Sequence, residues 1–235
     1  MHRLLLIVLF FPLLANAKEK PAKEKSPARV CRILFLNPPA DAPKKLFLFD
    51  GTASREVELP EATLSEIHKM PAGETVLYLT PNPVEKPDQV PPGAPSAKLP
   101  AEFGDFYILV TPDPANTVAP VRIQIMDAGP QKFKKGQMMW FNLTSSTISG
   151  QLGSQKLELG GQSRVIVDEP AKVNEPFDVN LSYLIPNDPL PRPVCQTKWI
   201  HEPRSRMVMF VHSATENGVP QIAGFKDFRD SPAAK

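Results

Sequence analysis

The sequence predicts an all-β protein made of two immunoglobulin-like antiparallel β-sandwich modules. Short apolar or alternating runs recur about every ten residues and are bounded by Pro, Gly, Asn and Asp, a spacing typical of sandwiches and barrels. The chain also carries 28 prolines in 235 residues, against an average of about 5%. Long helices therefore have little room in this sequence.

The expected strands fall into a set of seven and a set of eight. The first set comprises residues 29–36, 45–49, 55–59, 65–70, 74–80, 105–111 and 121–127, and the second comprises residues 136–143, 147–152, 156–160, 163–167, 177–185, 195–200, 206–212 and 220–226. Each set is large enough for one sandwich. We therefore expect one module over residues 29–128 and the other over residues 136–228.

The module boundary is placed in residues 128–136, because this leaves a full sandwich on each side. Residues 81–100 hold seven prolines, and such a segment is extended and short of backbone N–H donors. We interpret the proline-rich loop 81–103 as a structural loop of the first module. A module boundary inside this loop is the alternative.

Side-chain alternation predicts opposite positions for two of the strands. The stretch MMWFNL, residues 138–143, has apolar side chains on both faces, so it is expected to be a central or inter-module strand that is covered twice. The stretch SREVELP, residues 54–60, alternates apolar with charged side chains. It is therefore expected to be an outer strand with one solvated face.

The two halves of the chain share a pattern of turns. In each half an apolar strand precedes a hairpin whose turn carries small polar residues, Asp50-Gly51-Thr52 in the first and Gly153-Ser154 in the second. A glycine-led strand that ends at proline follows, PAGETVLYLTP in the first half and GQSRVIVDEP in the second. These parallels predict an internal duplication.

Residues 1–17 have the pattern of a secretory signal peptide. A weakly basic start precedes an apolar run, and Ala15-Asn16-Ala17 fits an A-x-A cleavage site. The apolar run is shorter than the roughly 20 residues that a membrane span needs. We expect cleavage near Ala17, no membrane span afterwards, and a periplasmic or secreted location. Residues 18–28 are expected to form a disordered tail, and residues 229–235 a C-terminal tail.

The charge balance argues against nucleic acid as a partner. The chain has 27 basic and 25 acidic residues, and signal cleavage would remove only Arg3 among them. Recognition of phosphates needs a clustered positive surface. A nearly neutral chain does not predict one.

The two cysteines, Cys31 and Cys195, lie in an early and a late expected strand. Because exported proteins meet an oxidising compartment, a disulfide between them is expected. Two separate buried thiols are the alternative. The bond would stabilise the fold by about 4–5 kcal/mol and would hold the two modules side by side.

The most chemically varied stretch is CQTKWIHEPRSR, residues 195–206. In the structural interpretation, Trp199 is a core residue, and His201, Arg204 and Arg206 cap a hairpin and pair with nearby acids. In the functional interpretation, the same four side chains form an aromatic and cationic patch that stacks on a sugar ring or holds a carboxylate. The structural interpretation is favoured, and the four residues remain the candidate binding patch.

The sequence contains no motif for catalysis or for metal binding. Its four histidines and two cysteines form no C-x-x-C, H-x-x-x-H or H-E-x-x-H pattern. GGQSR lacks the glycine that a nucleophile elbow needs after Ser163, and Asp168-Glu169 lies in a solvated turn. We expect a non-enzymatic protein without cofactor or metal. The alternative is an enzyme with a dispersed site that gathers His201 or His212 with a carboxylate.

A resemblance adds to this interpretation. RILFLNPPADAPKKLFLFDG followed by MPAGETVLYLTP resembles the repeat of exported bacterial β-sandwich domains of unknown function, with turns of the SPDAP, Asp-Gly and PAG type. The stretch from GQMMWFNL to SRVIVD is similar, more faintly, to small periplasmic sandwich proteins that accompany exopolysaccharide acetylation. The resemblance implies the fold and export, and it assigns no catalytic residue.

Together these observations predict an exported, non-enzymatic structural or protein-interaction component of a bacterial cell envelope. Its partner would be an envelope protein or polysaccharide, and exposed sheet edges are candidate contact sites because a partner can add a strand there. The first alternative is a carbohydrate-binding module centred on Trp199.

Overall fold

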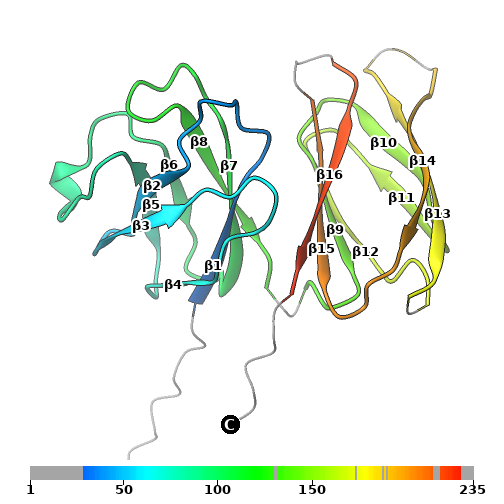
Figure 1. Cartoon of the computed structure of the whole chain (residues 1–235), viewed down its shortest axis with the longest axis horizontal. Helices are drawn as coiled ribbons and strands as arrows, with labels where there is room; N and C mark the ends of the chain where they lie inside the picture. Colours follow the sequence, from blue (N-terminus) through cyan, green and yellow to red (C-terminus); the bar gives the residue numbers. More distant parts are fainter. Residues whose placement is uncertain are drawn as a thin grey trace, which may run out of the picture.

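The computed structural model describes residues 29–129, 132–172, 174–186, 188, 190–213 and 218–228. These residues form 16 strands in four sheets of four strands each (Figure 1). The predicted all-β class and the two β-sandwich modules are confirmed. The predicted signal peptide and both predicted tails lie outside the described residues.

The first sandwich consists of sheets with strand orders β4-β1-β7-β8 and β3-β2-β5-β6. Its strands are β1 (Arg29–Phe35), β2 (Lys45–Phe49), β3 (Ser54–Glu58), β4 (His68–Met70), β5 (Thr75–Thr80), β6 (Ser96–Leu99), β7 (Asp105–Pro112) and β8 (Val121–Asp127). The 3₁₀ turn η1 (Pro87–Gln89) lies between β5 and β6.

The second sandwich consists of sheets with strand orders β12-β9-β15-β16 and β11-β10-β13-β14. Its strands are β9 (Met138–Asn142), β10 (Thr147–Leu152), β11 (Gln155–Leu159), β12 (Arg164–Val167), β13 (Pro176–Leu184), β14 (Arg192–Ile200), β15 (Arg206–His212) and β16 (Gln221–Asp227). The chain passes from one sandwich to the other between β8 and β9.

The two sandwiches have the same topology, strand for strand. In each one the first strand pairs in parallel with the seventh and antiparallel with the fourth, and the second strand lies between the third and the fifth. This agreement supports the predicted duplication but corrects one of its details. The strand in GQSRVIVDEP is β12, which occupies the place of β4, whereas the strand in PAGETVLYLTP is β5, whose counterpart is β13.

Each expected strand has a counterpart in the structure, with ends that differ by at most three residues. The strand that sequence analysis missed is β6, which lies inside the proline-rich loop 81–103 and pairs with β5. Its four residues, SAKL, are too few to show alternation, and prolines flank them on both sides. The loop is therefore part of the first sandwich, since its strand completes one of the two sheets.

The four sheets stack as layers, with three apolar cores between them (Figure 1). The first core fills the space inside the first sandwich, and the third core fills the second sandwich. The second core lies between sheet β4-β1-β7-β8 and sheet β12-β9-β15-β16, and so joins the two modules. The two inner sheets are therefore covered on both faces.

The burial predicted for residues 138–143 and 54–60, which form β9 and β3, is confirmed. In β9, Met138 and Trp140 enter the third core, while Met139 and Phe141 enter the second core between the modules. The strand is covered twice because it belongs to an inner sheet. In β3, which forms the edge of an outer sheet, the core-facing Val57 is 1% exposed, and its charged neighbours on the outer face are exposed.

The predicted disulfide is wrong, because Cys31 and Cys195 are not bonded to each other. Cys31 faces the first core from β1, whereas Cys195 packs at the border of the third core from β14. Two sheets and the inter-module core separate them, so no side-chain movement brings the sulfurs together. The modules lie side by side for another reason, which is the apolar core between them.

The mass of the unfolded, alkylated protein is expected to be the same with and without prior reduction. Alkylation of both cysteines without reductant would show that no intramolecular disulfide has formed. In the folded protein the Cys195 thiol should react slowly near neutral pH, because burial raises its pKa and the thiolate is the reactive form. Mass spectrometry after timed alkylation checks both points. A peptide joining Cys31 to Cys195 would contradict the layered arrangement.

Candidate functional site

Trp199 packs at the border of the core of the second sandwich. Its ring stacks on Trp140 at a centroid distance of 6.2 Å and meets the edge of Phe177 at 6.3 Å. Trp199 is half-buried on β14 and packs against the third core. One face of its ring is therefore engaged within the protein, while part of the side chain stays exposed.

The other three members of the candidate patch lie in different surroundings. His201 is buried, whereas Arg204 is exposed and pairs with Glu202 at 3.2 Å. Arg206 is buried at the start of β15 and faces the junction between the modules. The connection is also not a hairpin turn, because β14 and β15 belong to different sheets. The structure thus does not bring the four side chains together on one exposed surface.

Arg206 instead belongs to a charged cluster that sequence analysis did not find. Asp227, at the end of β16, accepts hydrogen bonds from Arg206 at 2.6 Å, from Arg32 at 2.6 Å and from the Tyr107 hydroxyl at 2.5 Å. Arg206 also pairs with Asp105 at 3.3 Å. Since residues 32, 105 and 107 come from the first sandwich and residues 206 and 227 from the second, the cluster ties the two modules together.

The surroundings of Arg206 keep it charged despite its burial. Burial acts to lower its pKa, but the electrostatic interactions with Tyr107 and Asp227, the hydrogen bond to Asp227 and the charge of Asp105 outweigh burial and raise the pKa. The guanidinium also lies over the Phe133 ring, 4.9 Å from its centroid, which is a favourable cation–π distance. The cluster is therefore a set of matched charges that serves cohesion between modules.

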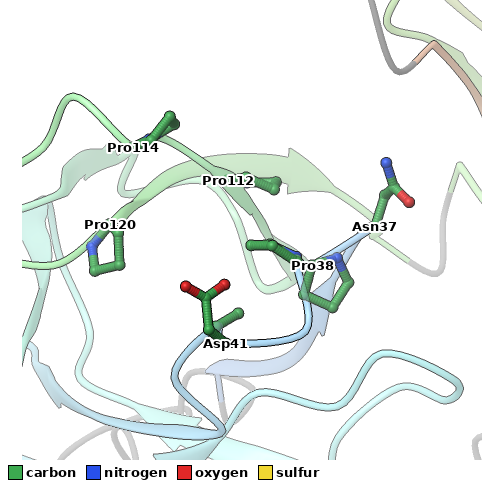
Figure 2. Close-up of a pocket in the computed structure, with 8 residues that line it drawn as sticks. Asn37, Pro38, Asp41, Pro112, Pro114 and Pro120 are labelled. Carbon is green, nitrogen blue, oxygen red and sulfur yellow. The ribbon is translucent and has the colours of Figure 1, made fainter.

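A shallow pocket of about 520 Å³ lies at the far end of the first sandwich from the start of β1 (Figure 2). The loops between β1 and β2 and between β7 and β8 form it, and its lining is Asn37, Pro38, Pro39, Asp41, Ala42, Pro112, Pro114 and Pro120. Figure 2 shows the Asp41 carboxylate directed toward the space below Pro112 and Pro120. The lining offers mainly proline ring surface, with the Asn37 amide and the Asp41 carboxylate as its polar side-chain groups.

A second pocket, of about 400 Å³, is lined by Lys134, Lys135, Gln137, Asp168 and Glu169. Gln137 donates a hydrogen bond to Asp168 at 2.8 Å. Neither pocket lining includes a histidine. In the part of the chain that the structure describes, no group of three or more His, Cys, Asp or Glu side chains is arranged to hold a metal ion.

The edges of the outer sheets differ in how they are covered. In the first sandwich β6 lies against β8 of the other sheet, and in the second β11 lies against β12. At the opposite edges, within the described ranges, the backbones of β3 and β14 do not approach the second sheet of their sandwich to this extent, although the Arg55 side chain of β3 donates a hydrogen bond to the Lys69 carbonyl in β4. β14 is nine residues long and one of the two longest strands of the described chain. Among the described residues, each outer sheet therefore has one open strand edge.

The comparisons with known proteins leave the family open. No protein-family model matches the chain, and no curated protein matches it. No helix among the described residues is long and apolar enough to cross a membrane.

Replacing Asp227 by Asn is expected to lower the free energy of unfolding by about 3 kcal/mol, because it leaves the buried Arg206 and the half-buried Arg32 short of a counter-charge. Urea unfolding followed by circular dichroism measures this loss. Glu202→Gln removes the partner of an exposed arginine and should leave the urea midpoint close to that of the parent protein. Equal midpoints for all three proteins would show that the cluster does not hold the modules together.

Proposed function

We propose that the protein is an exported, non-enzymatic structural or protein-interaction component of a bacterial cell envelope. The observation that carries the proposal is the open edge of β14 on a body whose two modules are joined by an apolar core and a buried charged cluster. A rigid body with an unpaired edge is suited to contact with another protein, because a partner strand can complete the sheet. The signal-like residues 1–17 support a location in the periplasm or outside the cell.

A protein partner is favoured over a polysaccharide by the position of the aromatic side chains. Sugar binding by stacking needs an accessible aromatic face, and one face of Trp199 is already stacked on Trp140. Arg206, the other strong contributor to the candidate patch, is bound to Asp227 and Asp105. The strand edge, in contrast, offers backbone groups and exposed side chains to a partner.

The export part of the proposal predicts processing near Ala17. The full chain, expressed in a bacterium with a general secretion pathway, should be recovered from the periplasm or medium with Lys18 as its first residue. N-terminal sequencing of the recovered protein measures this. A variant without residues 4–14 should stay in the cytoplasm, and recovery of the parent protein from the cytoplasm with an intact first segment would contradict export.

The contact part of the proposal predicts cross-links at β14. A photo-crosslinking residue in place of the exposed Gln196 should join the exported protein to another polypeptide in living cells, seen as a band of higher mass after illumination. The same residue in place of Lys156, on the covered edge of the same sheet, is the matched control and should give much less product. Equal yields at the two positions would contradict a role for the β14 edge.

A further inference from the structure

We propose that the partner at the β14 edge is a second copy of this chain, whose β3 edge pairs with β14 to give head-to-tail assembly. This inference rests on the proposed function, because it names the partner of the same edge. It follows from three features: the direction of the backbone groups along β14, the same property of β3, and the opposite charges of the two edges.

The register of β14 against β13 shows which of its backbone groups face outward. His201 donates its backbone N–H to Glu175, and the register pairs Trp199 with Phe177 and Thr197 with Val179. Because hydrogen-bonded pairs alternate along an antiparallel ladder, residues 197, 199 and 201 direct their N–H and C=O groups toward β13. Residues 196, 198 and 200 therefore direct theirs away from the sheet.

β3 has the same property. The backbone hydrogen bonds from Asp50 to Ala53 and from Leu59 to Lys44 mark residues 53, 55, 57 and 59 as those bonded to β2. Residues 54, 56 and 58 consequently direct their N–H and C=O groups outward. The Arg55 side chain reaches across to the carbonyl of Lys69 in β4, and the Ser54 hydroxyl binds the backbone N–H and C=O of Val84. These bonds use no backbone group of residues 54, 56 or 58.

The outward residues of the two edges carry complementary side chains. Antiparallel pairing that places Lys198 opposite Glu56 also places residue 196 opposite 58 and residue 200 opposite 54. Directly opposed residues share one face of a sheet, so the Lys198 ammonium and the Glu56 carboxylate would meet on the solvent face. Lys198 now pairs with Asp178 at 3.5 Å and Glu56 with Lys45 at 3.0 Å. All four of these side chains are more than half exposed, so exchange of partners costs little.

Pairing of β14 with β14 of another copy is disfavoured by the same side chains. If two β14 strands pair through residues 196, 198 and 200 around a two-fold axis, Lys198 of one copy lies opposite Lys198 of the other. Directly opposed like charges destabilise a strand pair. The length of the β14 edge that can pair is limited by Pro193, which has no backbone N–H, and by the irregular register near Leu181 and Ser182. Such features are usual at edges that are protected against unspecific association.

The position of the two edges decides the form of the assembly. β3 belongs to one outer sheet and β14 to the other, at opposite ends of the four-layer stack (Figure 1). A contact between two different surfaces of the same chain is heterologous, and it propagates into an open filament or closes into a ring. The assembly would therefore grow beyond a dimer.

Charge reversal tests the proposal on the purified exported protein. The parent protein should form species larger than a dimer as its concentration rises, measured by sedimentation velocity at low salt. Lys198→Glu and Glu56→Lys should each weaken self-association about tenfold, because attraction becomes repulsion at the pair. An equimolar mixture of the two variants should assemble again. In the mixture one variant is acidic and the other basic at both edge positions, so that alternating copies restore opposite charges at every contact.

Lys156→Glu is the matched control, because Lys156 is an exposed lysine on the covered edge of the same outer sheet. It should assemble as the parent does, and all variants should keep the parent's urea midpoint within error. A parent protein that stays monomeric, that stops at a dimer, or whose mixed variants fail to reassemble would overturn the proposal. The proposed function fails separately, through cytoplasmic location or through loss of the cross-link difference between positions 196 and 156.

Discussion

The structure depends on the burial of both faces of its two inner sheets. Each inner sheet must supply apolar side chains to one sandwich core and to the core between the modules, so β7 and β9 are apolar along their whole central length. Parallel pairing, of β1 with β7 and of β9 with β15, occurs only in these doubly covered sheets of the described chain, in keeping with the general preference of parallel strands for burial. The disulfide that would have joined the modules is not needed for their packing.

The same constraint explains the charged cluster around Asp227. A carboxylate or guanidinium cannot remain buried at the junction of the modules without a partner, and here the partners come from both sides of the junction. Arg206 reaches Asp227 within its own module and Asp105 in the other. Apolar packing alone does not fix the orientation of two surfaces. The ion pairs and hydrogen bonds of the cluster do, and they therefore fix how one module is oriented on the other.

A rigid four-layer body leaves the outer sheets as the surfaces that can act on other molecules. Their covered edges, at β6 and β11, differ from their open edges, at β3 and β14, although the two sandwiches share one topology. Equivalent strand positions in the two modules therefore differ in how far they are covered. The open edges carry opposite charges on their exposed faces, which is the basis for proposing that copies of the chain associate through them.

The sequence by itself determined the all-β class, nearly all of the strands, and the double burial of β9, because these follow from local alternation and from proline and glycine at the turns. It did not reveal β6, which is too short to show alternation, nor the cluster at Asp227, whose members lie far apart in the chain. It also grouped Trp199, His201, Arg204 and Arg206 by proximity in sequence. Only the tertiary structure decided that these residues lie in different layers. The chain crosses from one sheet to another between β14 and β15, so residues that are close in sequence face different cores.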